Sequence, residues 1–219
     1  MPAAPRTPTP ARTGSGPGRP KDLAKREAIL RAAMSLFLEQ GYTGTSMDTV
    51  AQTAGVSKLT VYSHFGDTEG LFNATVQATC ASMVPATLFQ PDVTAPLRDQ
   101  LMQIARAVHS LVGSPVSLAT QRMLLDPATD PHIREVFWQA GPQPMTAAFV
   151  AFLTGHVAAG HLAIADIERS ADLFFYMVNG EPLTRLIYGQ TPPPGGAASE
   201  DHLAAAVDLF LRAHVPDES

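Results

Sequence analysis

The twenty residues from Ser46 to Phe65 constrain the fold of this chain more than any other stretch. They read SMDTVAQTAGVSKLTVYSHF, and two segments with helical patterning flank Gly55-Val56-Ser57. Glycine suits a tight turn because it adopts positive φ without steric cost, and Ser46 can cap the free amides that open the first segment. The sequence therefore predicts two short helices, over 47–54 and 58–64, joined by a tight turn.

The two predicted helices share an apolar face that would hold them together. The small Ala51 lets them approach closely, and the face itself consists of Val50, Ala54, Val56, Val61 and Phe65. This is the pattern of a helix-turn-helix, whose second helix lies in the major groove of DNA. An ordinary helical hairpin that binds no DNA has the same local pattern, so the segment alone leaves both interpretations open.

Charge is divided unevenly along the chain, whose net charge is −5. Residues 1–31 carry seven Lys or Arg against two acidic residues, whereas residues 81–219 carry seven Arg against fourteen acidic residues. This asymmetry indicates that only the N-terminal part meets a polyanion, although chance clustering beside a basic tail gives the same numbers. We expect residues 1–21 to be a disordered basic arm, from which Arg19 enters a minor groove or stays in solvent.

Apolar periodicity predicts an all-α chain with a large core, for which a hydrophobic content of 45% is ample. One helix is expected from Asp22 to Gln40, ended by Gly41, and another from the N-cap Asp67 to about Met83. In the second half of the chain, a helix is expected from 97 to 113, and the cap Ser114 begins another that ends at 125. Four more are expected over 132–139, 145–159, 166–188 and 199–214, and Pro182 should kink the third of these.

In their order and spacing, these segments resemble the DNA-binding domain of TetR-family transcriptional regulators. The resemblance covers residues 22–83 and rests on the first helix, Tyr42-Thr43-Gly44-Thr45-Ser46, Ala51…Ala54-Gly55-Val56-Ser57, Thr60-Val61-Tyr62-Ser63-His64-Phe65 and Leu71-Phe72. A looser resemblance to the C-terminal domain of the AefR-like branch rests on Arg122-Met123-Leu124-Leu125, Phe137-Trp138…Gly141-Pro142, Gly160-His161-Leu162 and Asn179-Gly180. Together they imply a DNA-binding domain over 22–83, with its helix-turn-helix at 46–65, and a helical regulatory and dimerisation domain over 84–219.

The resemblance also implies roles for the residues of the recognition segment. Lys58 would reach a phosphate or a guanine edge, Leu59 a thymine methyl group, and Thr60 a base or a phosphate. Phosphate contacts set the register, and they are expected from the side chains of Tyr62 and His64 and from hydroxyl or amide groups at Ser46 and Ser57. Tyr62 has a structural alternative as an aromatic brace of the small core.

Two residues depart from the family pattern. Leu59 stands where a small residue is common, and Thr68 stands where a lysine is common before the glutamate of the fourth helix. We therefore expect an altered base preference near Leu59 and the loss of one phosphate contact at Thr68.

Two apolar stripes near the C-terminus predict how the chain associates. They contain Ile167, Ala171, Phe174 and Val178 in the first helix, and Leu203, Val207, Phe210 and Leu211 in the second. Helices near 166–189 and 199–214 can pair with their copies as a four-helix bundle, which is where TetR-like proteins usually dimerise. The alternative is that both stripes face the core of their own chain.

A small-molecule effector would need an apolar pocket in the second domain, and the family resemblance implies that its entry shifts the helix that begins at Asp67. Candidate lining residues are Met123, Phe137, Trp138, Phe152, His156 and Phe175. Each has plain core packing as its alternative, since aromatic and methionine side chains at helical spacing usually pack.

No arrangement of residues predicts an enzyme, a cofactor or a metal site. His156 and His161 would lie about 140° apart on a helix, and Gly160 separates them, so we expect no shared ion. The single Cys80 excludes an internal disulfide, and neither a membrane span nor a secretory signal is expected. The sequence thus predicts a cytoplasmic, ligand-responsive regulator, most simply a homodimeric repressor on a palindromic operator; the alternative is a helical ligand- or protein-binding module that no longer binds DNA.

Overall fold

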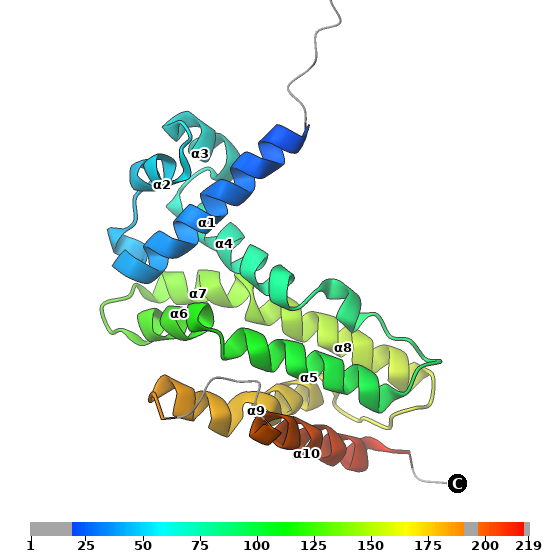
Figure 1. Cartoon of the computed structure of the whole chain (residues 1–219). Coiled ribbons are helices and arrows are strands. Elements are labelled where there is room, and N and C mark those ends of the chain that lie inside the picture. The colour runs from blue at the N-terminus through cyan, green and yellow to red at the C-terminus, as the bar shows by residue number, and fades with distance from the viewer. Residues whose placement is uncertain (1–18, 191–196, 217–219) are drawn as a thin grey trace, which may run out of the picture.

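The computed structural model describes residues 19–190 and 197–216, and all regular secondary structure in these two ranges is helical (Figure 1). The predicted all-α fold class is therefore confirmed. The first helix, α1 (Arg19–Gly44), begins three residues before its predicted start. The prediction of a disordered arm over residues 1–21 is wrong for residues 19–21, which belong to α1; residues 1–18 and the side chain of Arg19 lie outside what the structure describes.

The first four helices form one unit, at the upper left of Figure 1. After α1 come α2 (Met47–Ala54), α3 (Lys58–Phe65) and α4 (Thr68–Met83). Gly41 interrupts the helical path of α1 with a φ of 73°, so the predicted helix end at this glycine is confirmed.

Local capping sets the boundaries of the three shorter helices. Ser46, Ser57 and Asp67 each accept a hydrogen bond from the backbone amide three residues further on, at 3.1, 3.2 and 2.8 Å. Gly55 takes the left-handed conformation with a φ of 66°, which ends α2 and turns the chain into α3. The predicted helix–turn–helix between residues 46 and 65 is therefore confirmed in its geometry.

The core of this unit also receives a helix from the second half of the chain. Phe37 and Phe72 meet edge to face at 5.1 Å, among Ile29, Val50, Val61 and Leu71. Ile133, Val136 and Ala140, which belong to α7 (Pro131–Ala140), are buried in the same cluster. Because α7 packs on α4, a change in one half of the chain is transmitted to the other through close-packed side chains.

The second unit is a bundle of the remaining helices. They are the 3₁₀ helix η1 (Ala86–Phe89), α5 (Leu97–Val112), α6 (Pro115–Leu125), α7, α8 (Pro142–Ala158), α9 (Ile167–Ile187) and α10 (Ala197–His214). The helix η1 was not predicted, and α8 starts three residues early because proline is tolerated in a first helical turn. The predicted continuation of this helix past Pro182 is confirmed, because α9 runs to Ile187.

The two apolar stripes of α9 and α10 face the core of their own chain. Ala171, Phe174 and Val178 of α9 are fully buried, and so are the stripe residues of α10, namely Leu203, Val207 and Phe210. The Phe174 ring lies 4.8 Å from that of Phe149 and 5.1 Å from that of Phe210. The prediction that these residues form a dimer seam is wrong, and any seam on α9 and α10 must use their outer faces.

Candidate DNA-binding surface and ligand pocket

Large side chains that were predicted to contact DNA are exposed to solvent on α3, the second helix of the helix-turn-helix. The side chain of Leu59 is 79% exposed and Tyr62 is 41% exposed, although both are large and hydrophobic. Tyr62 is therefore not a brace inside the small core, whereas Val61 of the same helix is fully buried there. An exposed leucine and tyrosine on one short helix suit contact with another molecule better than they suit solvent.

Three of the hydroxyl groups predicted to contact DNA already serve the local fold. The Ser46 and Ser57 hydroxyls cap α2 and α3, and the Thr60 hydroxyl lies 2.8 Å from that of Ser57. A capping hydroxyl that accepts from a backbone amide has one remaining lone pair and its own proton. Ser46, Ser57 and Thr60 stay predicted DNA contacts, with a capping role in addition.

Both basic side chains of α3 are held by carboxylates of neighbouring helices. Lys58 Nζ lies 2.6 Å from Asp48 Oδ1, and His64 Nε2 lies 3.0 Å from Asp22 Oδ1. The Asp48 hydrogen bond raises the pKa of Lys58. His64 is only 15% exposed, so it is less available to a phosphate than Lys58 is.

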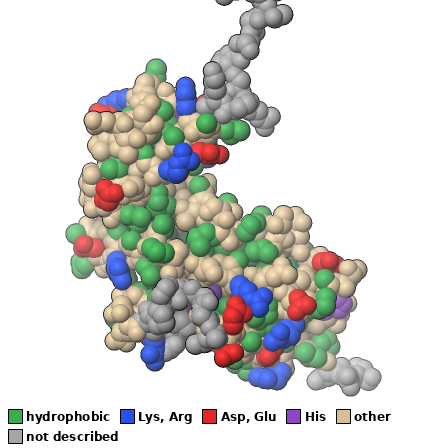
Figure 2. Space-filling view, in the orientation of Figure 1, with side chains coloured by type: hydrophobic (Ala, Val, Ile, Leu, Met, Phe, Trp, Pro, Cys, Tyr) green, Lys and Arg blue, Asp and Glu red, His purple; other side chains and the backbone are tan. Residues whose placement is uncertain are grey.

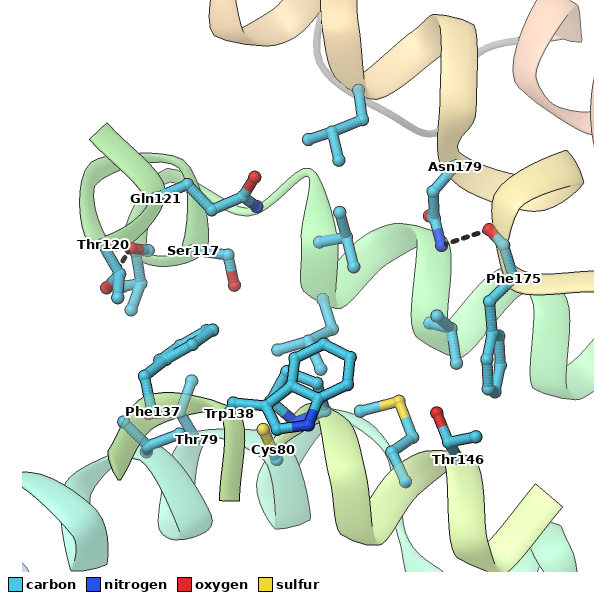
Figure 3. Close-up of a pocket in the computed structure, with 18 of the residues that line it drawn as sticks. Thr79, Cys80, Ser117, Thr120, Gln121, Phe137, Trp138, Thr146, Phe175 and Asn179 are labelled. Carbon is cyan, nitrogen blue, oxygen red and sulfur yellow. Dashed lines mark hydrogen bonds between the residues drawn. The ribbon is translucent and has the colours of Figure 1, made fainter. Parts of the chain in front are cut away.

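A cavity of about 410 Å³ lies between the DNA-binding unit and the bundle. Residues from α1 and α4 to α9 line it, which places α4 in the wall of the cavity along its second half. Figure 3 shows Phe137 and Trp138 of α7 on one side, Asn179 and Phe175 of α9 on another, and Ser117, Thr120 and Gln121 of α6 beside them. Its size suits a drug-sized ligand.

The wall of this cavity is apolar with a few neutral polar groups. The Thr120 hydroxyl is bound to Val116 O and the Asn179 amide donates to Phe175 O, while burial raises the pKa of Cys80 and keeps its thiol neutral. Lys, Arg and His are absent from the described lining, and Asp172 is its one carboxylate. Such a wall disfavours an anionic ligand, because a buried anion would lack a cationic partner.

The structure brings together half of the predicted ligand residues. Phe137, Trp138 and Phe175 line the cavity, whereas Phe152 and His156 are buried deeper in the bundle and Met123 packs against the DNA-binding unit. The predicted residues are mainly aromatic and methionine residues, so the polar residues that line the cavity were not predicted. Polar residues within otherwise apolar helices could have indicated this lining, as with Ser117, Gln121, Thr146 and Asn179.

The predicted separation of His156 and His161 is wrong. Their Nδ1 atoms lie 3.2 Å apart, because Gly160 has a φ of 76° and the His161 amide folds back to donate to His156 O. Burial, followed by the proximity of His161, lowers the pKa of His156. Within the described ranges, no three His, Cys, Asp or Glu side chains come together as metal ligands.

None of the helices in the described part of the chain has the length and apolar character that a membrane span requires. An exposed helix-turn-helix, joined through α4 to a helical bundle with an apolar cavity, defines a DNA-binding transcriptional regulator. Residues 29–75 match the family described as bacterial regulatory proteins of the tetR family, and residues 99–216 match the C-terminal domain of AefR-like transcriptional repressors. The chain belongs to the TetR family.

Individual relatives agree with this assignment. YdeS, an HTH-type transcriptional regulator of Bacillus subtilis, is 28% identical over 72% of this chain and 78% of that protein. A TetR-family regulator from Mesorhizobium loti is 26% identical with a TM-score of 0.72, covering 90% and 99% of the two chains. The flavonoid-responsive regulator FrrA is 31% identical with a TM-score of 0.71, covering 89% and 98%. These relatives are transcriptional regulators rather than enzymes.

Proposed function

We propose that this protein is a ligand-responsive repressor that binds a palindromic operator as a dimer. The observation that carries the proposal is the composition of the cavity wall. Val76, Thr79 and Cys80 of α4 and Met34 of α1 line the cavity, so a bound ligand would contact the two helices that support the helix-turn-helix. Ligand binding and the position of α3 would then be coupled directly.

The coupling requires a ligand that distinguishes two arrangements of α4. A dimer places two recognition helices in successive major grooves, about 34–36 Å apart or a multiple of that distance. A ligand that fits the cavity better when α4 has moved shifts the population away from this spacing, by no more than its differential affinity. The operator is then released although ligand and DNA do not compete for the same site.

For the dimer we propose the outer faces of α9 and α10, which lie side by side at the bottom of Figure 1. Members of this family bind DNA and act as dimers. Leu173 and Tyr176 of α9 and Leu209 of α10 are exposed, although their neighbours on the inner faces are fully buried. Burying these three side chains against a second copy would remove apolar surface from water.

We further propose that the effector is a planar, uncharged aromatic compound of the flavonoid class. FrrA, which is similar over nearly its whole length, is described as flavonoid-responsive. The cavity of this chain is lined by Phe137, Trp138 and Phe175, with hydroxyl and amide groups that can bind phenolic oxygens. Aromatic stacking with a few hydrogen bonds is the chemistry that recognises such molecules.

The chain carries its own reporter for this test. Trp138 is the single tryptophan, and it lines the cavity while remaining 51% exposed. Titrating a flavone such as apigenin should quench its fluorescence saturably, and the same flavone should release the protein from DNA upstream of its own gene in a gel shift. A fatty acid such as palmitate, an anion of similar volume, should do neither.

The outcomes separate the parts of the proposal. If the protein binds no DNA even at low salt, the repressor function is contradicted and a helical binding module is favoured. DNA binding that persists while apigenin leaves Trp138 unquenched would contradict only the proposed effector class. Quenching without release of DNA would contradict the coupling through α4.

A further inference from the structure

Lys58 opens α3, and its ammonium group is held from two sides. Nζ lies 2.6 Å from Asp48 Oδ1 and 2.9 Å from Oδ2, and it sits 5.8 Å from the centre of the Tyr62 ring. Asp48 belongs to the first turn of α2, so the ion pair bridges the two helices of the helix-turn-helix. The side chains of Lys58 and Asp48 are 57% and 61% exposed, which leaves both open to a competing partner.

The ion pair places an anion on a surface that must meet phosphates. A carboxylate repels the DNA backbone, and it also occupies the lysine that would otherwise bind any phosphate within reach. The pattern recurs at the far end of α3, where Asp22 binds His64. Other charge pairs also join helices but lie away from the helix-turn-helix: Figure 2 shows acidic and basic side chains together over α5 and α10, which Arg98–Asp208 and Arg106–Glu200 connect.

The paired groups match the major-groove edge of a G·C pair better than that of an A·T pair. In a G·C pair, guanine N7 and O6 are two adjacent acceptors and the amino group of the paired cytosine is a donor, whereas in an A·T pair the adenine amino group lies between two separate acceptors. The Lys58 ammonium is a donor and the adjacent Asp48 carboxylate is an acceptor, and the two lie side by side. A G·C pair can therefore offer two acceptors to the ammonium and one donor to the carboxylate, an A·T pair offers one of each, and a phosphate satisfies Lys58 but repels Asp48.

We propose that Asp48 is a specificity-determining residue, which withholds Lys58 from non-specific phosphates and directs it, together with the Asp48 carboxylate, to a G·C pair in each half-site. This inference rests on the proposed operator binding. Asp48 lowers the affinity for random DNA more than the affinity for the operator, so it raises the ratio between the two. Sequence discrimination depends on that ratio rather than on the affinity for one site.

The test compares full-length wild type with Asp48→Asn, which keeps the size of the side chain and removes its charge. The probe for non-specific binding is a 30-base-pair duplex of random sequence, titrated over a range of salt concentrations. Asp48→Asn should bind this duplex about eightfold more tightly at 0.1 M salt. The reason is that one more neutralised phosphate adds about 0.9 to the magnitude of the slope of log K against log salt concentration. Sites selected from a random pool by Asp48→Ala, which removes the acceptor as well as the charge, should lose a G·C preference that wild type shows in each half-site.

Three further variants isolate the pair from general charge effects. Asp48→Glu keeps the carboxylate and should retain the wild-type discrimination, which also controls for the position of Asp48 in the first turn of α2. Glu39→Gln makes the same charge change on α1, where Glu39 binds Ser35, and should leave both affinities unchanged. In a Lys58→Met background, Asp48→Asn should lose most of its effect on random DNA.

Several results would overturn the inference. Unchanged or weaker binding of random DNA by Asp48→Asn would do so, and so would an equal gain in the Lys58→Met background, because the effect would then be simple repulsion. A retained G·C preference in the selected sites would refute the base contact. If wild type itself binds neither random nor selected duplexes, the proposed DNA-binding function fails instead, which is a separate result.

Discussion

At the scale of single residues, Leu59 separates base contact from backbone contact. Its side chain offers no hydrogen bond, and its 79% exposure leaves the thymine methyl group as its natural partner in the major groove. Leu59→Ala should remove a thymine preference at one position per half-site and leave the affinity for random DNA nearly unchanged. Selection from a random duplex pool measures this, and a uniform loss of affinity across sequences would contradict it.

Tyr62 is expected to behave in the opposite way. Tyr62→Phe removes the hydroxyl and keeps the ring over which the Lys58 ammonium lies. Loss of one phosphate hydrogen bond should weaken binding to all duplexes by about 1 kcal/mol, without changing the preferred sequence. Filter binding on a selected and a random duplex tests this, because a loss confined to the selected duplex would assign Tyr62 to base reading.

The sequence is informative about residues wherever the chemistry is local. The caps at Ser46 and Asp67 and the positive φ of Gly55 were predicted, since each depends on residues within one turn. The partner of Lys58 was not predicted, because it depends on how α2 and α3 pack against each other. The meeting of His156 with His161 was missed for a related reason, namely the chain reversal at Gly160.

At the scale of elements, Gly70 sets the distance between α3 and α4. A Cβ on Gly70 would come 2.2 Å from the carbonyl oxygen of Phe65, the last residue of α3. Gly70→Ala must therefore push α3 and α4 apart, which should cost about 1–3 kcal/mol of stability and weaken operator binding. Gln77→Ala, at an exposed position on the same helix, is the matched control and should change neither the melting temperature nor DNA affinity.

The outer faces of α9 and α10 carry the next prediction. Leu209→Glu should place a charge in the proposed dimer seam and convert the protein to a monomer with weaker operator binding. Leu125→Glu is the matched control, because Leu125 is also an exposed leucine and lies at the end of α6. Sedimentation velocity distinguishes the two states, and a Leu209→Glu protein that remains dimeric would place the seam elsewhere.

Periodicity predicted where most helices lie, and it could not predict which surface each stripe meets. Phe174 and Phe210 recur at helical spacing whether they face their own bundle or a second copy, and the structure shows that they face the bundle. The cavity was equally hidden, because its wall draws on α1 and on helices from α4 to α9. Trp138 and Phe137 were predicted as lining residues from the type of their side chains. A sequence gives the side-chain types of a pocket but not which helices come together to form it.

At the scale of the whole molecule, buried histidines make stability depend on pH. Burial is the first cause of the lowered pKa of His109, His156 and His214, three residues of the second unit. His109 is buried, its Nδ1 lies 3.2 Å from Val178 O, and its ring centre lies 6.4 Å from that of His202. The charged or polar groups that influence it also include Asn179 and Glu200. The folded protein therefore holds these rings neutral at pH values where the unfolded chain already protonates them.

The sign of the effect follows from this difference in bound protons. Below about pH 6.5 the unfolded chain binds more protons than the folded protein, so stability falls as pH falls. The slope is at most about 1.4 kcal/mol per pH unit for each of the buried rings of His109 and His156, and it is smaller for the partly exposed His214. His132 acts in the opposite direction, because its 2.9 Å pair with Glu69 raises its pKa. That pair contributes stability below about pH 6.5 and loses it as pH rises through the raised pKa, but it is exposed and screened.

The buried rings should therefore dominate, and the melting temperature should fall between pH 7.5 and pH 5.5. His109→Gln removes one titrating group and should flatten this dependence, whereas His132→Gln should steepen it slightly, because a group that stabilises at low pH is lost. Calorimetry across the range measures both variants against wild type. A melting temperature that rises on acidification would mean that the buried histidines acquire protons without loss of packing, and it would refute the neutral core of the second unit.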